Sequence, residues 1–194
     1  MTDAAQVGKM IEGAEKDRGP VAILVNNAGS AVTGPFAKSN PQFFQDMWNV
    51  HVMGAVHASQ AVLPGMVERG FGRIVNVAST AGLRGYPYVS AYCAAKHALV
   101  GLTRALAAET ATRGVTVNAV CPGYTDTDIV RDSIDRVVEK TGRARNDVLA
   151  EYLHDTPIGR LIRPEEVAAA VLYLCSPQAA AVSGTTLAVA GGEM

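Results

Sequence analysis

The chain has 194 residues, of which 48% are hydrophobic and 18% charged, with a formal net charge of -1. This length suffices for one domain with a sizeable core, and the composition is that of a soluble globular fold. The basic residues are scattered, which excludes an electrostatic basis for binding nucleic acid or an acidic membrane surface. No apolar run approaches the ~18 residues of a membrane span, so we expect no membrane partner.

The chain contains three cysteines, Cys93, Cys121 and Cys175. An odd count without scaffold spacing predicts free thiols in a reducing compartment. The first residues are polar and lack the basic region of a signal peptide, so a cytoplasmic location is expected. Cys93 is the cysteine nearest the candidate chemistry, where a packing role is the simpler interpretation. The cysteines and histidines show no ligand spacing, which argues against a metal site.

Apolar runs of strand length alternate with helical stretches. Val21–Val25 is a continuous apolar run and predicts a strand buried on both faces. Asn40–Met66 is expected to be a long helix, with Asn40 as N-cap and Pro41 at the first helical position. Further strands are predicted at Arg73–Ala78, Val115–Val120 and Thr186–Val189, and further helices at Val89–Arg113, Ile129–Tyr152 (broken near Gly142) and Pro164–Leu174. The alternation predicts an α/β fold with a parallel sheet wrapped on both faces.

Three polar residues, Ser79, Tyr92 and Lys96, carry the strongest chemical signal. Tyr92 and Lys96 are four residues apart, so they share one face of a helix and can meet. A free tyrosine loses its proton near pH ~10, and lowering that pKa to about 7 requires ~4 kcal/mol of preferential phenolate stabilisation. A partly desolvated lysine can supply much of it. Such a pair is also common on ordinary helices, so the spacing alone does not establish a site.

The chain resembles the short-chain dehydrogenase/reductase family along nearly its whole length. Leu24–Gly29 ends in the family's NNAG motif, Gly72–Ser79 is similar to its fifth strand with the catalytic serine, and Tyr92 with Lys96 forms its YxxxK motif. Val117–Gly123 matches its sixth strand and the turn that follows, and Pro164–Ala168, Ser183–Gly184 and Gly191–Gly192 together match its C-terminal signature. Each motif is weak by itself, but five in the right order are specific.

The resemblance implies a doubly wound, Rossmann-like sheet and an oxidoreductase that interconverts a ketone and a secondary alcohol by hydride transfer. In the family's mechanism Ser79 would hold the substrate oxygen, Tyr92 would exchange the proton, and Lys96 would lower the Tyr92 pKa and hold the cofactor ribose. The residues implied in binding NAD or NADP are Asn27, Ala28, Gly29, Tyr92, Lys96, Pro122, Gly123, Thr125 and Thr127. The family's residue that selects NAD or NADP has no counterpart in this sequence, so that preference is unreadable.

One departure from the family is His51, where an asparagine is usual. In the family that asparagine helps to hold a water that passes protons to the lysine. A histidine can also hold a water, and it titrates near neutral pH. Asn49, just before it, points elsewhere on a helix and is a poor substitute. The alternative, that His51 only packs against a neighbouring strand, is equally open.

The other departure is at the beginning of the chain. The family opens with a strand and a glycine-rich turn that places the cofactor pyrophosphate at a helix N-terminus. Here Gly8 is the only glycine before residue 13, and no apolar strand precedes it. We therefore expect residues 1–194 to form a single domain that lacks the family's first βαβαβ half. Val21–Val25 would then be an exposed apolar edge, and the chain would bind dinucleotides poorly.

Two segments are expected near the substrate. Residues 130–161 correspond to the family's variable lid, and Leu83–Tyr88 is expected to line the substrate mouth. Arg143 and Arg145 could meet a phosphate of a CoA or carrier-protein substrate, although simple solvation is the better expectation.

The resemblance favours 3-oxoacyl or 3-hydroxyacyl thioester substrates. It also implies a homotetramer or homodimer assembled through the helices at 40–66 and 89–113. An alternative is a truncated, catalytically silent subunit that acts only in oligomer assembly. A serine hydrolase is disfavoured because Ser79 is not in a G-x-S-x-G elbow.

Overall fold

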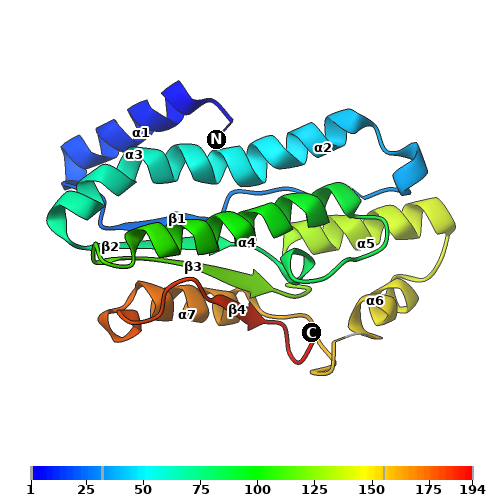
Figure 1. The fold of residues 1–194 in the computed structure, drawn as a ribbon. Helices are drawn as coiled ribbons and strands as arrows, with labels where there is room; N and C mark the ends of the chain where they lie inside the picture. Colours follow the sequence, from blue (N-terminus) through cyan, green and yellow to red (C-terminus); the bar gives the residue numbers. More distant parts are fainter. Residues whose placement is uncertain (1, 32, 155, 194) are drawn as a thin grey trace.

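The computed structural model of the protein describes residues 2–31, 33–154 and 156–193. Its centre is a four-stranded sheet of order β1-β2-β3-β4, in which each neighbouring pair is parallel (Figure 1). The strands are β1 (Ile23–Asn26), β2 (Gly72–Val77), β3 (Val115–Pro122) and β4 (Thr186–Val189). The predicted parallel α/β architecture is confirmed.

Helices cover both faces of this sheet (Figure 1). The core clusters place α3 (Gly54–Arg69) and α4 (Ser90–Thr110) on one face and α7 (Pro164–Cys175) on the other. The predicted break near Gly142 separates α5 (Asp128–Thr141) from α6 (Arg145–His154). In the described part of the chain, no helix is long and apolar enough to cross a membrane.

Strand β1 is less buried than its apolar sequence predicts. Ile23 and Val25 are 46% and 40% exposed, whereas Leu24 points to the opposite face and packs into the core. Among the described residues, β1 pairs only with β2, so its other side is the edge of the sheet. The prediction of burial on both faces is therefore wrong, and the predicted apolar edge is present.

The helix expected over residues 40–66 begins as predicted but is interrupted. The Asn40 side chain accepts a hydrogen bond from the Gln42 backbone N–H at 2.9 Å, and Pro41 opens α2 (Pro41–Trp48). Asn49–Met53 then form a π-helical turn before α3. Turns of this kind are frequent at functional sites, and this one carries the buried side chain of His51. An apolar pattern of period 3.6 does not reveal the widened turn.

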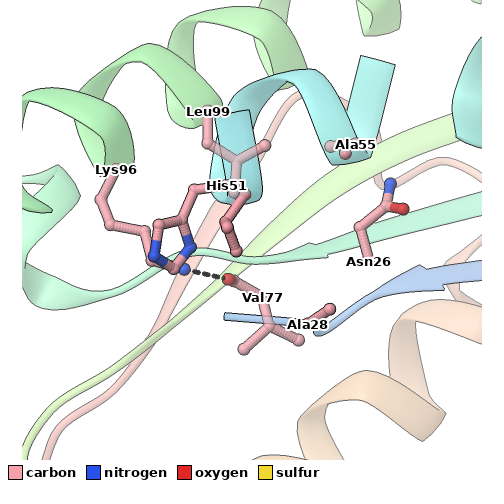
Figure 2. A pocket seen from close by; sticks show the side chains of 9 residues that line it. Asn26, Ala28, His51, Ala55, Val77, Lys96 and Leu99 are labelled. Atoms are coloured by element: carbon pink, nitrogen blue, oxygen red, sulfur yellow. Dashed lines mark hydrogen bonds between the residues drawn. The ribbon is translucent and has the colours of Figure 1, made fainter. Parts of the chain in front are cut away.

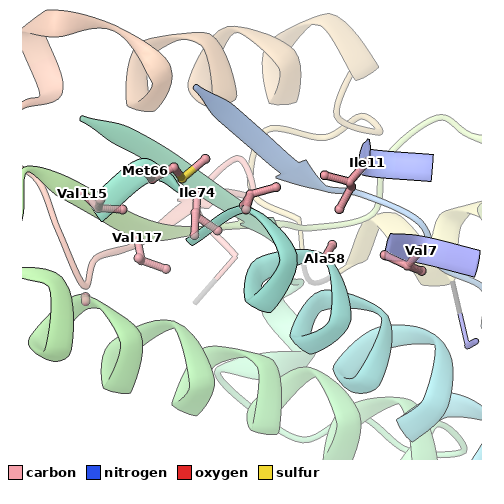
Figure 3. Close-up of a cluster of buried hydrophobic side chains, with 9 residues drawn as sticks. Val7, Ile11, Ala58, Met66, Ile74, Val115 and Val117 are labelled. Carbon is pink, nitrogen blue, oxygen red and sulfur yellow. The ribbon is translucent and has the colours of Figure 1, made fainter. Parts of the chain in front are cut away.

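Helix α1 (Ala4–Arg18) is absent from the elements expected from the sequence. The Asp3 carboxylate caps it by accepting from the Gln6 backbone N–H at 3.0 Å, and Gly19, with a φ of 87°, ends it. Val7 and Ile11, one helical turn apart, are buried in the cluster that α1 shares with α3 and the sheet (Figure 3). Two signals in the sequence could have revealed this helix: the Asp3 N-cap and the four-residue spacing of Val7 and Ile11.

Candidate functional site

The candidate site is a cleft of about 690 Å³ beyond the carboxyl ends of β1, β2 and β3. In parallel sheets, ligands bind at this end of the strands. The loops that follow these strands contribute Asn27, Ser79 and Gly123. The predicted site residues that line the cleft are Asn27, Gly29, His51, Ser79, Tyr92, Lys96, Pro122, Gly123, Thr125 and Thr127. Ala28 instead lines a much smaller cavity nearby.

Ser79 is brought to α4 by a short, tight loop. Its Oγ accepts a hydrogen bond from the Ala81 backbone N–H at 3.1 Å and caps a 3₁₀ turn over Thr80–Gly82. A Cβ on Gly82 would lie 2.7 Å from the Lys96 carbonyl oxygen, so only glycine permits this close approach. The Ser79 side chain and the Tyr92 phenol consequently line the same cleft, and Ser79 acts to lower the pKa of that phenol.

The phenol of Tyr92 is not acidified as the sequence suggests. Burial raises the pKa of Tyr92 above its ordinary value, and the Ser79 side chain opposes that rise only in part. The Lys96 ammonium donates instead to the Val77 carbonyl at 2.8 Å and lies 5.4 Å from the Tyr92 ring centroid. The lowering of the Tyr92 pKa by Lys96 that the sequence predicts is not seen in this arrangement.

Lys96 is itself strongly perturbed. It is 4% exposed, and burial lowers the pKa of its ammonium to about 8. The nearby Cys121 thiol has its pKa raised to about 11 by burial, so it stays neutral and offers no counter-charge. Lys96 is thus a buried cation that can exchange a proton close to neutral pH.

His51 is a buried, neutral imidazole. Its Nε2 lies 2.7 Å from the Ser30 carbonyl oxygen, and a carbonyl only accepts, so Nε2 carries the proton. Burial and the Lys96 charge lower the pKa of His51 to about 4, although the Ser30 bond opposes this. The expectation that His51 titrates near neutral pH is therefore wrong. Its ring also packs edge-on against Tyr92, with centroids 5.3 Å apart.

A cavity of about 10 Å³ lies between His51 and Lys96, which is the size of one water molecule. Figure 2 shows the Lys96 side chain reaching past the His51 ring to the Val77 carbonyl. His51 Nδ1 has no hydrogen-bond partner among the described residues. A Cβ on Gly29 would lie 2.6 Å from His51 Cε1, so glycine is required for the ring to fit.

Comparison with known proteins identifies the family. The family model described as enoyl-(acyl carrier protein) reductase matches residues 1–193. The chain is a short-chain dehydrogenase/reductase. It is 44% identical over 193 residues to the "inactive 2-(S)-hydroxypropyl-CoM dehydrogenase 2" of Xanthobacter autotrophicus, covering 99% of this chain and 81% of the relative. It is 40% identical over 179 residues to the acetoacetyl-CoA reductase of Rhizobium meliloti, covering 92% and 70% respectively.

A solved structure agrees with this assignment. The crystal structure of an actinorhodin polyketide ketoreductase variant with NADPH matches this short-chain dehydrogenase/reductase with a TM-score of 0.93. The two chains are 37% identical, and the match covers 98% of this chain and 74% of that one. The Rossmann-like fold expected from the motifs is confirmed.

Several smaller expectations for this short-chain dehydrogenase/reductase have clear outcomes. All three cysteines are free, as predicted, with Cys93 and Cys121 buried. Arg143 pairs with Glu151 at 2.6 Å, and Arg145 pairs with Asp135, so both arginines are held by partly exposed carboxylates. The described residues contain no group of three or more His, Cys, Asp or Glu arranged to hold a metal ion.

The segment Leu83–Tyr88 is not where the sequence suggests. None of its residues lines the cleft, because Arg84 and Tyr86 turn toward the buried carboxylate of Glu193. Sequence reasoning overlooked Glu193 and also Ser30, whose contribution to the site is a backbone carbonyl. A backbone contact leaves no trace in residue type, whereas a glutamate beside the Gly191–Gly192 motif was visible.

The depressed pKa of His51 predicts an acid-sensitive fold. The unfolded chain takes up a proton at its ordinary pKa of 6.5, whereas the folded protein does so only near pH 4. The stability contributed by the neutral ring is thus complete above pH 6.5 and is lost as pH falls toward 4. Between pH 7 and pH 4, the free energy of unfolding measured in urea should fall by about 3 kcal/mol more in wild type than in His51→Gln. A stability difference that is constant with pH would contradict the buried neutral ring.

Proposed function

We propose that this protein interconverts a ketone and a secondary alcohol, with NAD or NADP as the hydride carrier. One observation carries the proposal: the side chains of Ser79, Tyr92 and Lys96 line a single cleft. Two hydroxyl groups that converge on one point can hold a carbonyl oxygen and supply its proton. General acid catalysis of this kind is worth ~10²–10⁴ in rate.

The electrostatics suit Tyr92 as the acid in the reducing direction. Its raised pKa keeps the phenol protonated at neutral pH, ready to donate to the alkoxide that forms. Ser79 would donate to the same oxygen and fix its position. Lys96, with a pKa of about 8, would return a proton toward Tyr92 after each turnover. A water in the cavity beside His51 Nδ1 would feed that proton from solvent.

The cleft fits the nicotinamide end of the cofactor better than its pyrophosphate. The hydroxyls of Thr125 and Thr127 and the turn at Pro122–Gly123 line it and suit a carboxamide and a ribose. When bound, the cofactor supplies the hydride. Among the cleft-lining side chains Lys96 alone carries a formal charge at neutral pH, and the Val25 and Leu172 side of the cleft is apolar. The segment Asn27–Gly29 would run along the adenosine side of the cofactor and contact it through backbone atoms and small side chains.

Weak dinucleotide binding is expected because Lys96 is the one cationic side chain among the described residues that line the cleft. We expect titration calorimetry of this chain with NADH or NADPH to give a Kd of about 1 mM, or a free energy of about -4 kcal/mol. Nicotinamide mononucleotide, which lacks the adenosine half, should bind about as well. A micromolar Kd for either dinucleotide would contradict the inference, since it requires a pyrophosphate cradle that the described residues do not provide.

We favour 3-oxoacyl or 3-hydroxyacyl thioesters as substrates, because a relative at 40% identity is named an acetoacetyl-CoA reductase. Ile129 and Val130, at the beginning of α5, line the cleft and would contact the acyl chain. Residues 130–161, which include most of α5 and all of α6, would then act as the substrate lid of a single domain over residues 1–194. The free thiols suit a reducing cytoplasm.

A second candidate is a catalytically silent subunit, which the "inactive" relative at 44% identity and the single cationic side chain of the cleft favour. Such a subunit would assemble through α2, α3 and α4 into a homodimer or homotetramer. Helix α2 exposes Phe43 and 44% of Trp48. Ala94, Gly101 and Ala105 form an exposed stripe of small residues on α4 that permits close helix approach.

Coenzyme consumption separates the two candidates. The protein is mixed with acetoacetyl-CoA and 5 to 10 times the expected Kd of NADPH or NADH, about 5–10 mM, and the loss of reduced coenzyme is followed. The proposed reductase consumes coenzyme in proportion to the thioester added, and Ser79→Ala does so far more slowly. The silent subunit would consume coenzyme no faster than a mixture without protein, and it would elute from a sizing column as a defined oligomer.

A further inference from the structure

Glu193 is buried in a way that is unusual for a glutamate. It follows β4, where Gly191 and Gly192 adopt φ values of 60° and 93° and turn the chain back toward the interior. The side chain of Glu193 is 0% exposed. A carboxylate is costly to remove from water, so its contacts must compensate.

One oxygen of this carboxylate holds the segment that follows Ser79. Glu193 Oε1 accepts hydrogen bonds from Arg84 Nη2 at 2.8 Å and from the Tyr86 hydroxyl at 2.5 Å. The Tyr86 hydroxyl also lies 2.7 Å from Thr80 Oγ1, and Thr80 is the next residue after Ser79. Burial and the bond to Glu193 both raise the pKa of Tyr86, so the phenol keeps its proton.

The other oxygen lies against the turn at Gly123. Glu193 Oε2 has no hydrogen-bond partner among the described residues. It lies against the backbone of Gly123, where a Cβ would come within 2.6 Å of it. The Tyr86 ring in turn contacts Tyr124 edge-on, with centroids 6.2 Å apart. One buried side chain therefore joins the Ser79 segment to the Gly123 turn.

We propose that Glu193 is a positioning residue for the reduction, acting through Ser79. By fixing Thr80 and Tyr86 relative to Gly123, it sets the distance between the Ser79 hydroxyl and the turn proposed to hold the nicotinamide. Glu193 does not line the cleft and touches no substrate. The kinetic consequence of this inference rests on the proposed function. Whether Glu193 fixes the segment from Thr80 to Tyr86 can be tested separately.

The kinetic test uses Glu193→Gln, which keeps size and removes charge, with the exposed Glu12→Gln on α1 as matched control. We expect kcat/KM for acetoacetyl-CoA to fall about tenfold in Glu193→Gln and to stay unchanged in the control. When Ser79 is already replaced by alanine, Glu193→Gln should lower kcat/KM by less than about twofold, because Glu193 acts through Ser79. An equal loss in both backgrounds, or no loss in either, would overturn the positioning role.

The structural test does not depend on activity. Trypsin cleavage at Arg84, followed by mass spectrometry, should become about tenfold faster in Glu193→Gln than in wild type. Unchanged protection would overturn the proposal. If Glu193→Gln does not fold, Tyr86→Phe, which removes only the hydroxyl, should give the same two changes. If wild type consumes no coenzyme, the proposed function fails, and the cleavage rate alone decides whether Glu193 holds this segment.

Discussion

Replacing Tyr92 by phenylalanine should lower turnover by about a hundredfold to ten-thousandfold, the usual contribution of a general acid. The substitution removes one hydroxyl from a ring that packs edge-on against His51, so the fold should be retained. It also leaves Lys96 bonded to Val77, so coenzyme affinity should change little. Steady-state reduction of acetoacetyl-CoA at saturating coenzyme measures the first effect, and calorimetry measures the second.

The control for Tyr92→Phe is Tyr173→Phe. Tyr173 is 46% exposed on α7, and loss of its hydroxyl should leave both turnover and coenzyme affinity as in wild type. Equal turnover in Tyr92→Phe and wild type would remove Tyr92 from its proposed role. A large loss of coenzyme affinity in that variant would instead assign Tyr92 to binding.

Replacing Lys96 by methionine should abolish most turnover and stabilise the fold at the same time. The folded protein holds the Lys96 pKa at about 8, whereas the ordinary value is 10.5. Keeping the ammonium charged inside the protein below pH 8 costs about 3 kcal/mol. Loss of the bond to Val77 offsets about 1 kcal/mol of that, so we expect a net gain of about 2 kcal/mol in the free energy of unfolding at pH 7.

The pH dependence of this gain follows from the sign of the shift. Between pH 8 and 10.5 the unfolded chain binds more protons at Lys96 than the folded one, so wild-type stability recovers as pH rises through that window. The advantage of Lys96→Met should therefore be full below pH 8 and gone near pH 10.5. Urea unfolding at pH 7 and pH 10 tests this, with exposed Lys9→Met as control. A variant less stable than wild type at pH 7 would contradict a costly buried cation.

Much of the fold was predictable from local sequence signals. Mainly apolar runs of strand length predicted β2 and β3, which have neighbours on both edges and helices over both faces. The same signal overstated the burial of β1, because an apolar run does not show whether a neighbouring strand is present. The π-helical turn around His51 was also unpredictable, since its widened backbone has no distinct residue pattern.

In the site, the sequence predicted which residues come together but not how their pKa values are shifted. Motif order predicted that Ser79, Tyr92 and Lys96 come together, and they line one cleft. The directions of their pKa shifts were not predictable from spacing. Lys96 stands one helical turn from Tyr92 but bonds to a strand carbonyl, so burial, not the ammonium, governs the phenol. His51 likewise depends on the Ser30 carbonyl, which has no signature in side-chain type.

Transfer of deuterium from labelled coenzyme is the sharpest test of hydride transfer by this protein. The protein is incubated with acetoacetyl-CoA and NADPH or NADH carrying deuterium at either face of the nicotinamide C4, and the 3-hydroxy product is examined by mass spectrometry and NMR. We expect one deuterium on the carbinol carbon, delivered from one face of the nicotinamide only, and strongly reduced labelling with Tyr92→Phe. An unlabelled product, or no product at any coenzyme concentration, would contradict this expectation.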